Sequence, residues 1–254
     1  MVELAARPGF SVTVIRCAND HPGWSAAEVS PVDRMVLVRR GRFRRRVRGT
    51  ESHADPTAAY FVEAGEEESF AHPAGEDVCT TVDFGEGVWQ RLAGDRPPRS
   101  PVYVDGALEL AHRRLVASAA DPGYALAEQL LVLVGRAVTR PTRAVPGDRG
   151  LVERAREAIV ADTPAAAGLF PLAESLGVSP YRLSRAFPRE LGVSVTRYRN
   201  RVRVGRALER LEAGERELAV LAADLGFADQ AHLTRTVREH AGAPPGVVRR
   251  LLAG

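Results

Sequence analysis

The spacing of hydrophobic and polar positions changes partway along the chain. Between residues 10 and 105, short apolar runs separated by turn residues are typical of an antiparallel sandwich or small barrel. From residue 107 onward, apolar residues recur at the three- and four-residue spacing of helices. The pattern predicts an α+β fold, β-rich first and helical afterwards. The expected strands are Phe10–Cys17, Met35–Val38, Phe43–Val47, Ala59–Val62, Val78–Phe84 and Pro101–Val104.

Two amphipathic helices are expected directly after the strands. They cover Ala107–Ala119 and Tyr124–Ala137 and are joined by the turn Asp121–Gly123. Helices joined by so short a turn pack antiparallel. The second is apolar over so much of its surface that it packs either within the chain alone or also against a second copy. Residues 138–150 hold two Pro and two Gly without apolar periodicity, so they are expected to form a linker.

An internal repeat occupies the C-terminal region. The stretches LAESLGVSPYRLSRAF and LAADLGFADQAHLTR align, with Gly177 matching Gly226. Each copy predicts a short helix, a turn carrying the glycine, and a second helix that begins after a capping residue, Ser179 or Asp229. This layout is typical of the helix-turn-helix, whose second helix enters the major groove of DNA. Two such units are therefore predicted.

Exposed side chains on the two second helices are the candidates for reading bases. Arginine suits guanine edges and Gln230 suits adenine, whereas Ala231 could only contact a thymine methyl. Pro188 falls late in the first of these helices, and we expect a kink or an early end there. The candidate DNA-binding residues are Tyr181, Arg182, Ser184, Arg185, Gln230, Ala231, His232, Thr234 and Arg235.

Positive charge gathers around the first repeat. The chain has a formal net charge of only +3, yet residues 180–206 hold eight arginines and a single acid, Glu190. A helix over Val195–Ala213 is expected to connect the repeats and fix the distance between the two second helices. Its residues Arg197, Arg199 and Arg203 are candidates for DNA phosphate contacts, which would make affinity strongly salt dependent.

One expected strand of the N-terminal region is chemically unusual. In Phe43–Val47, alternation places Arg45 on the same face as the two apolar residues. A buried arginine needs an anionic partner. Either an anionic ligand in the barrel supplies it, which makes Arg45 a candidate ligand-binding residue, or acids of the chain do so at the rim.

The two cysteines of the chain suggest no disulfide framework, and a reducing cytoplasm is expected. Cys17 and His21 form one closely spaced pair, and His72 and Cys79 form another. If strands brought the pairs together, a Cys2His2 zinc site would be formed. The alternatives are buried thiols with surface histidines, binding of another soft metal, or thiol oxidation; otherwise no cofactor is expected.

The C-terminal hundred residues resemble the DNA-binding domain of the AraC/XylS family of bacterial transcription regulators. The resemblance rests on both repeats, on ELGVSVTRYRNRVRVGRALERL between them, and on the closing GAPPGVVR. It implies base contacts from Tyr181, Ser184 and Arg185 in the first unit and from Gln230, Ala231 and Arg235 in the second. The N-terminal region is similar to the cupin-like sensor domains of this family. Glu68 stands where a metal-binding cupin has a histidine, so no catalytic metal site is expected.

The leading hypothesis is a cytoplasmic, dimeric, non-enzymatic transcription regulator. It comprises a cupin-like barrel (1–105), a helical pair for dimerisation (106–137), a linker (138–150) and a DNA-binding domain with two helix-turn-helix units (151–254). Its expected partners are double-stranded DNA, a second copy, a small-molecule effector and RNA polymerase. The alternatives are a metal- or thiol-redox-responsive regulator, a cupin-type enzyme with a DNA-binding appendage, and an architectural DNA binder. No membrane span or secretory signal is expected.

Overall fold

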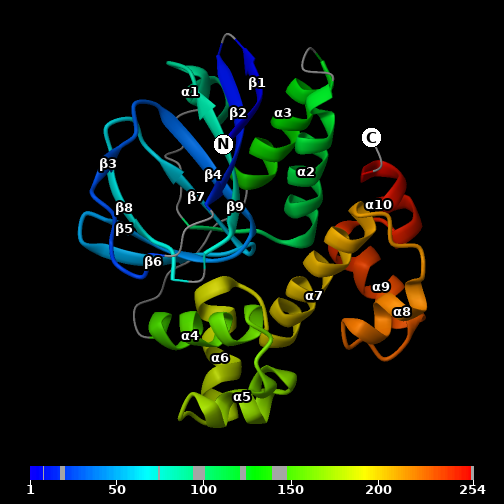
Figure 1. The fold of residues 1–254 in the computed structure, drawn as a ribbon. Coiled ribbons are helices and arrows are strands. Elements are labelled where there is room, and N and C mark those ends of the chain that lie inside the picture. Colours follow the sequence, from blue (N-terminus) through cyan, green and yellow to red (C-terminus); the bar gives the residue numbers. More distant parts are fainter. Residues whose placement is uncertain are drawn as a thin grey trace.

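Two antiparallel sheets form the N-terminal half of the computed structural model, which describes residues 1–7, 9–17, 21–73, 75–93, 101–120, 124–138 and 148–252. The larger sheet has the strand order β1-β2-β9-β4-β7-β10 and the smaller β3-β8-β5-β6 (Figure 1). The strands are β1 (Val2–Arg7), β2 (Phe10–Cys17), β3 (Glu28–Val29), β4 (Asp33–Arg40), β5 (Phe43–Val47), β6 (Thr50–Ala54), β7 (Ala58–Val62), β8 (Glu67–Ala71), β9 (Asp77–Phe84) and β10 (Val102–Tyr103).

Each of the six expected strands is present, with small changes at the ends. The strands that the pattern missed are β1, β3, β6 and β8. β6 reads TESHA and β8 reads EESFA, so polar residues outnumber apolar ones. β1 and β6 are also edge strands, and an edge strand needs less apolar surface than a central one. Their existence depends on partners that the local sequence does not specify.

The two faces of the larger sheet bury different cores. On β9, Val82 and Phe84 pack against the helical layer, whereas Cys79 lies among residues of both sheets, including Phe43 of β5. This alternation follows from the two-residue period of a strand. The larger sheet therefore separates the space between the sheets from the helices on its other side.

Helices cover that other side and make up most of the described residues from Gly106 onward (Figure 1). The predicted fold class, β-rich with a helical pair and then all-α, is confirmed. The α-helices are α1 (Val88–Ala93), α2 (Gly106–Ala117), α3 (Ala125–Val138), α4 (Arg149–Val160), α5 (Leu169–Ser175), α6 (Pro180–Leu191), α7 (Val195–Glu212), α8 (Leu218–Asp224), α9 (Gln230–Ala241) and α10 (Pro245–Leu252). Among the described helices, none has the length and apolar character to cross a membrane.

Two segments expected from the sequence concern residues that the structure does not describe. The expected turn at residues 121–123 lies outside the described residues, and so do residues 139–147 of the expected linker. Within the expected linker range, α4 already begins at Arg149, preceded by Asp148. The predicted helical pair corresponds to α2 and α3, which pack against each other.

Helix α2 joins the two halves of the molecule. Leu108 and Leu115 are buried in the core beside the larger sheet, whereas Leu110 belongs to the core of the second helix-turn-helix region. At the start of α2, a Cβ atom on Gly106 would lie only 2.8 Å from the His240 carbonyl oxygen of α9. A glycine is therefore required for this close approach, and the N-terminal half packs directly on the C-terminal half.

Candidate nucleic-acid interface

The first repeat forms a helix-turn-helix from α5 and α6. Gly177 between them has φ +68°, a conformation that glycine adopts without steric cost. The Ser179 side chain accepts a hydrogen bond from the Arg182 amide at 3.2 Å, and Pro180 occupies the first turn of α6. The predicted cap is confirmed. The inward face of α6 is buried in the core through Leu183, Ala186 and Phe187.

The second repeat has the same design in α8 and α9. Gly226 also has φ +68°, and the Asp229 carboxylate accepts a hydrogen bond from the His232 amide at 2.6 Å. Leu233 and Val237 are fully buried beneath α9. Both second helices are thus oriented by their caps and by one apolar face, which leaves the opposite face to solvent.

The candidate reading residues of α6 lie on its exposed face. Tyr181, Arg182, Ser184 and Arg185 are all exposed. The Arg185 guanidinium donates to the Tyr181 hydroxyl at 3.1 Å and lies 5.4 Å from the centre of its ring. Arg182 pairs with Asp148 at 3.2 Å. The Tyr181–Arg185 contact orients the two side chains together at the start of the helix.

On α9, Gln230, Ala231 and Arg235 are exposed, as a role in base reading requires. Thr234 is half-buried. His232 is also half-buried, and its ring lies edge-on to Phe227 at 5.4 Å with Nδ1 accepting from the Ala228 amide. In this conformation the imidazole contacts the turn between α8 and α9.

The expected disruption at Pro188 is wrong as to helix length. Helix α6 continues through Pro188 to Leu191 and ends at Gly192, which has φ +71°. Proline removes one amide donor, but the carbonyl that would have accepted from it belongs to the exposed residue Ser184, where water can replace the donor. Burial of Phe187 directly before the proline favours continuation of the helix.

The four arginines in the first half of α7 divide into two groups. Arg199 is half-exposed, Arg197 pairs with Glu239 of α9 at 3.2 Å, and Arg203 lies over the Phe227 ring at 5.7 Å. Burial, followed by the charge of Arg199, lowers the pKa of Arg203. These three remain candidates for phosphate contacts. Arg201, on the opposite side, is only 1% exposed and points into the molecule.

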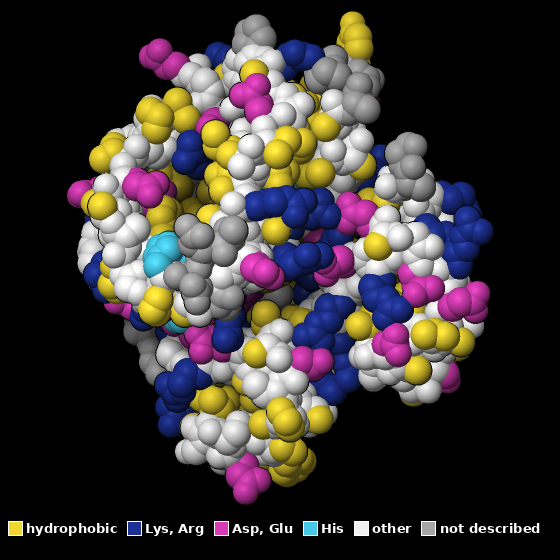
Figure 2. Space-filling view, in the orientation of Figure 1, with side chains coloured by type: hydrophobic (Ala, Val, Ile, Leu, Met, Phe, Trp, Pro, Cys, Tyr) yellow, Lys and Arg dark blue, Asp and Glu magenta, His cyan; other side chains and the backbone are white. Residues whose placement is uncertain are grey.

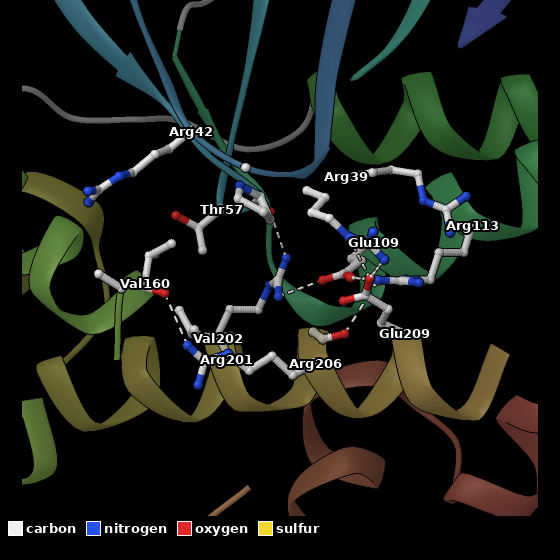
Figure 3. A pocket seen from close by; sticks show the side chains of 15 residues that line it. Arg39, Arg42, Thr57, Glu109, Arg113, Val160, Arg201, Val202, Arg206 and Glu209 are labelled. Atoms are coloured by element: carbon white, nitrogen blue, oxygen red, sulfur yellow. Dashed lines mark hydrogen bonds and ion pairs between the residues drawn. The ribbon is translucent and has the colours of Figure 1, made fainter. Parts of the chain in front are cut away.

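Arg201 connects α7 to the N-terminal half (Figure 3). Its Nε donates to the Val104 carbonyl at 2.7 Å. Its Nη2 donates to the Pro56 carbonyl at 2.9 Å. Its Nη1 pairs with Glu109 of α2 at 2.6 Å. One buried guanidinium thus holds the connecting helix against a strand end, a turn and α2.

Glu109 belongs to a larger network that we call the first anchor: Arg39, Glu109, Arg113, Arg201 and Glu212. Arg113 donates to Glu109 at 2.7 Å and pairs with Glu212, which also pairs with Arg39 at the end of β4. Burial tends to raise the pKa of Glu109, but Arg201 and Arg113 outweigh it and the pKa is lowered. Glu109 is therefore ionised in a fully buried position.

A second anchor comprises Asp55, Thr57, Arg156 and Tyr198. Arg156 of α4 donates to the Asp55 carboxylate at 2.7 Å, to Thr57 at 3.2 Å and to the Tyr198 hydroxyl at 3.3 Å. The Thr57 and Tyr198 hydroxyls are 2.8 Å apart. This group joins the turn between β6 and β7 to the first helix-turn-helix region. No motif in the sequence indicated either anchor.

In the surface view, arginines gather where the two halves meet, in the region of the connecting helix (Figure 2). A cavity of about 340 Å³ at this junction is lined by both halves. Acids lie among the arginines there, as the anchors require. The basic excess of this region therefore has a structural use as well as a potential use in binding DNA.

His112 is fully buried beside the first anchor, and its position gives a prediction. Burial, followed by Arg39 and Arg113, lowers its pKa to about 3. An unfolded histidine titrates near 6.5, so below that pH the unfolded state binds a proton that the folded state does not. The stability that depends on neutral His112 is present above pH 6.5 and is lost as the pH falls toward 3.

His112→Leu is expected to reduce the pH dependence of stability between pH 6.5 and 4 by up to about 1.4 kcal/mol per pH unit. Urea unfolding of both proteins across this range measures the slope. Equal slopes in the two proteins would show that His112 does not titrate on unfolding.

Arg45 points between the sheets, as alternation predicted, and its partners are acids of the chain. It pairs with Glu68 and, at 3.2 Å, with Glu66, and its guanidinium lies 4.4 Å from the Tyr60 ring. Arg45 is 6% exposed, so acids of the chain pair with it in a buried position, which agrees with the second alternative as to the partner. A role for Arg45 in binding a ligand stays a prediction.

A cavity of about 210 Å³ lies between the sheets, beside this ion pair. Cys17, His72 and Cys79 all line it, whereas His21 packs against the His72 ring at 4.8 Å. Within the described part of the chain, no three His, Cys, Asp or Glu side chains are placed to hold a metal ion together. The condition for a Cys2His2 zinc site, that strands bring all four side chains together, is therefore not met in the described residues. Burial, the largest cause, and Asp77 raise the pKa of both thiols.

Comparison with known proteins finds matches in the C-terminal region. Residues 172–251 match the family model described as "Helix-turn-helix domain". Over 78 residues the chain is 32% identical to the arabinose operon regulatory proteins of Salmonella typhimurium and Escherichia coli. These matches cover 31% of this chain and 28% and 27% of the relatives, so the chain spans less than a third of the length of the curated relatives it matches. They support the resemblance to AraC-type regulators in the C-terminal region.

Solved structures with similarity to the chain include ToxT from Vibrio cholerae. One ToxT structure has 9% identity and a TM-score of 0.41, with 97% of this chain and 99% of that chain covered. The C-terminal domain of AraT, a response regulator from Geobacillus stearothermophilus, has 30% identity and a TM-score of 0.37 over 43% of this chain and 88% of that one.

Proposed function

We propose that this chain is a DNA-binding transcription regulator of the AraC type. The observation that carries the proposal is the pair of helix-turn-helix units, each with a capped second helix whose outer face is exposed. In this proposal α6 and α9 enter major grooves, and α7 sets their separation. The curated relatives are regulators by name, and we infer a non-enzymatic role in the cytoplasm, with RNA polymerase as a partner.

Selection of bound DNA from a random pool tests the proposal. Enrichment of a site with two separated conserved blocks, about one helical turn apart, is the expected result. A pool that stays random after several rounds at physiological salt would contradict sequence-specific binding. The selected sequence would also give the half-site spacing for one chain or for two.

The arginines of the two reading helices are expected to contribute specificity. Arg185→Ala and Arg235→Ala should each lose about 1–3 kcal/mol of binding to the selected site and relax preference at a few bases, because each loses a base-edge contact. Fluorescence anisotropy on selected and random DNA measures both quantities. Arg199→Ala should instead weaken both DNAs alike, and Arg216→Ala, which alters an exposed residue outside the repeats' second helices, should change neither. Equal losses on both DNAs for Arg185→Ala would refute base reading.

We also propose that α3 mediates a homodimer. Its outer face exposes Leu131 at 56% and Val132 at 41%, while Leu126, Leu130 and Leu133 fill the core behind it. Two exposed aliphatic side chains in sequence on a helix are suited to packing against a second copy.

Leu131→Arg is expected to convert a dimer into a monomer at micromolar concentration in analytical ultracentrifugation. Leu251→Arg, at an exposed leucine of α10, is the matched control and should leave the dimer intact. A monomeric wild-type chain would contradict the dimer, and an unchanged Leu131→Arg dimer would place the interface elsewhere.

The N-terminal half is proposed to bind a small effector in the cavity between its sheets. This cavity has mixed apolar and polar walls that include Phe43, Tyr60 and Glu68. In the surface view, hydrophobic side chains line a hollow on this face of the molecule (Figure 2). The two anchors supply a physical connection from these sheets to the DNA-binding half.

A further inference from the structure

Both cysteines of the chain face the same cavity. They are the two cysteines in 254 residues, and they are 62 positions apart in sequence. Strands β2 and β9 are neighbours in register, with Ile15 opposite Cys79 and Cys17 opposite Asp77. Cys17 and Cys79 are therefore diagonal neighbours on one face of the sheet, and both are free thiols lining the 210 Å³ cavity.

The diagonal position favours a bridging ion over a disulfide. Diagonal neighbours on antiparallel strands have Cα atoms about 7–8 Å apart, whereas a disulfide requires Cα atoms within about 7 Å and Cβ atoms about 4 Å apart. Zinc–thiolate bonds are about 2.3 Å long, and an ion with bonds of similar length between two thiolates separates the sulfurs by up to about 4.6 Å. An ion held linearly by two sulfurs therefore spans the diagonal with less approach of the two strands than a disulfide requires.

The surroundings of the thiols favour a cation. Glu28 lies at the cavity wall and is exposed, and Glu68, whose charge is already paired with Arg45, lies inside it. The arginine of the lining, Arg34, is already paired with Asp83 at 2.5 Å. His72 also lines the cavity, and its Nδ1 is 2.5 Å from the buried Asp77 carboxylate. An anionic ligand would thus meet acids without a free arginine among the lining residues.

We propose that Cys17 and Cys79 together bind one soft metal ion that prefers two thiolate ligands, such as Hg²⁺, Cu⁺ or Ag⁺. Soft thiolate ligands select such ions. On binding a divalent ion, two S–H bonds break, two metal–sulfur bonds form, and two protons pass to solvent. No change of oxidation state is needed. That the ion acts as an effector rests on the proposed regulatory function; that it binds does not.

Only a few residues connect the two thiols to the DNA-binding half. Cys79 lies opposite Val38 of β4, and the next residue of β4, Arg39, pairs with Glu212 of α7 in the first anchor. Arg40 pairs with Glu209, one turn earlier in α7. A shift of β9 against β4 would therefore move the residues that hold the connecting helix.

The test uses the full-length, reduced chain without DNA and Hg²⁺ as the probe. The wild type is expected to bind one Hg²⁺ per chain by native mass spectrometry, with both thiols protected from alkylation. Both sulfurs belong to one chain, so binding of the second is intramolecular. The glutathione concentration needed to remove the ion should therefore be about 10²–10⁴-fold higher for the wild type than for Cys17→Ser or Cys79→Ala. Circular dichroism verifies folding, and Cys17 is only half-buried, so Cys17→Ser provides a test if Cys79→Ala fails to fold.

A double variant controls for two unrelated thiols. Cys17→Ser with Ser11→Cys keeps two cysteines in the chain but places the new one opposite Asp83, four residues along β9 from Cys79. It should bind two Hg²⁺ per chain, one on each thiol, and lose both to glutathione. Two Hg²⁺ on the wild-type chain, or equal glutathione resistance in wild type and variants, would overturn the proposal.

A separate arm addresses the effector role. Binding of the selected DNA should change at least several-fold when Hg²⁺ is added to the wild type and should not change for Cys17→Ser. Tight binding of one ion with unchanged DNA affinity would overturn the effector role alone. Loss of DNA binding under all conditions would contradict the proposed function and leave the metal site standing.

Discussion

Arg201→Met is expected to lower the free energy of unfolding by about 3–5 kcal/mol. The variant removes the 2.6 Å pair with Glu109 and both donors to the Val104 and Pro56 carbonyls. Glu109 would keep Arg113 as a partner but would remain buried with less compensation for its charge. The cost of leaving a buried charge insufficiently paired exceeds what a methionine gains by packing in the same space.

Arg199→Met is the matched control for this prediction. Arg199 lies two residues earlier on the same helix, is half-exposed and makes no ion pair within the described part of the chain. Its replacement should change stability by less than about 0.5 kcal/mol. Urea denaturation followed by circular dichroism compares the two. A loss below about 1 kcal/mol for Arg201→Met would show that the first anchor is not a main source of stability.

Asp55→Ala is the second large effect, also with an expected loss of about 3–5 kcal/mol. Arg156 is buried, and Asp55 supplies its single carboxylate contact in the second anchor, at 2.7 Å. Burial acts to lower the pKa of Arg156, yet Asp55 and Tyr198 raise it, so the guanidinium stays charged even without water around it. Removing the carboxylate leaves that charge with only hydroxyl partners.

Glu51→Ala provides the control for Asp55→Ala, because it removes an acid whose partner, Arg46, is 38% exposed at the side chain. Exposed ion pairs contribute at most about 1 kcal/mol. Hydrogen exchange of α4 and α7 provides a second readout: faster exchange there in Asp55→Ala, with β2 and β9 unchanged, is expected. Uniformly faster exchange over the whole chain would show general destabilisation rather than release of the first helix-turn-helix region.

Local features of the sequence predicted the helices and caps well. The Ser179 and Asp229 caps and the turn glycines act over three or four residues, so a short stretch contains all the information needed. The strands β6 and β8 were missed because their apolar content is low and their pairing partners lie elsewhere in the chain. Pro188 was misjudged because tertiary packing of Phe187 outweighs a local preference.

The anchors could not be predicted because their partners are distant in sequence. Arg201 and Val104 are 97 positions apart, and Arg156 and Asp55 are 101 apart. Glu109 and Arg113, four residues apart, have the spacing of an ordinary helical ion pair, which by itself does not indicate burial. Arg201 looked like one more basic residue of a DNA-binding helix. In each case burial changes the role of a charge, and burial follows from the packing of α2 on α7.

Helix α2 has a consequence for the construction of hybrid regulators. A chimera joined within residues 139–147 would separate the second helix-turn-helix region from Leu110, which completes its core, and from Glu109, which neutralises Arg201. A grafted foreign input domain would leave an apolar gap and an unpaired cation on the recipient. Hybrids that carry α2 together with residues 148–252 retain both contacts, so transplantable boundaries in this chain lie before Gly106 rather than after Val138.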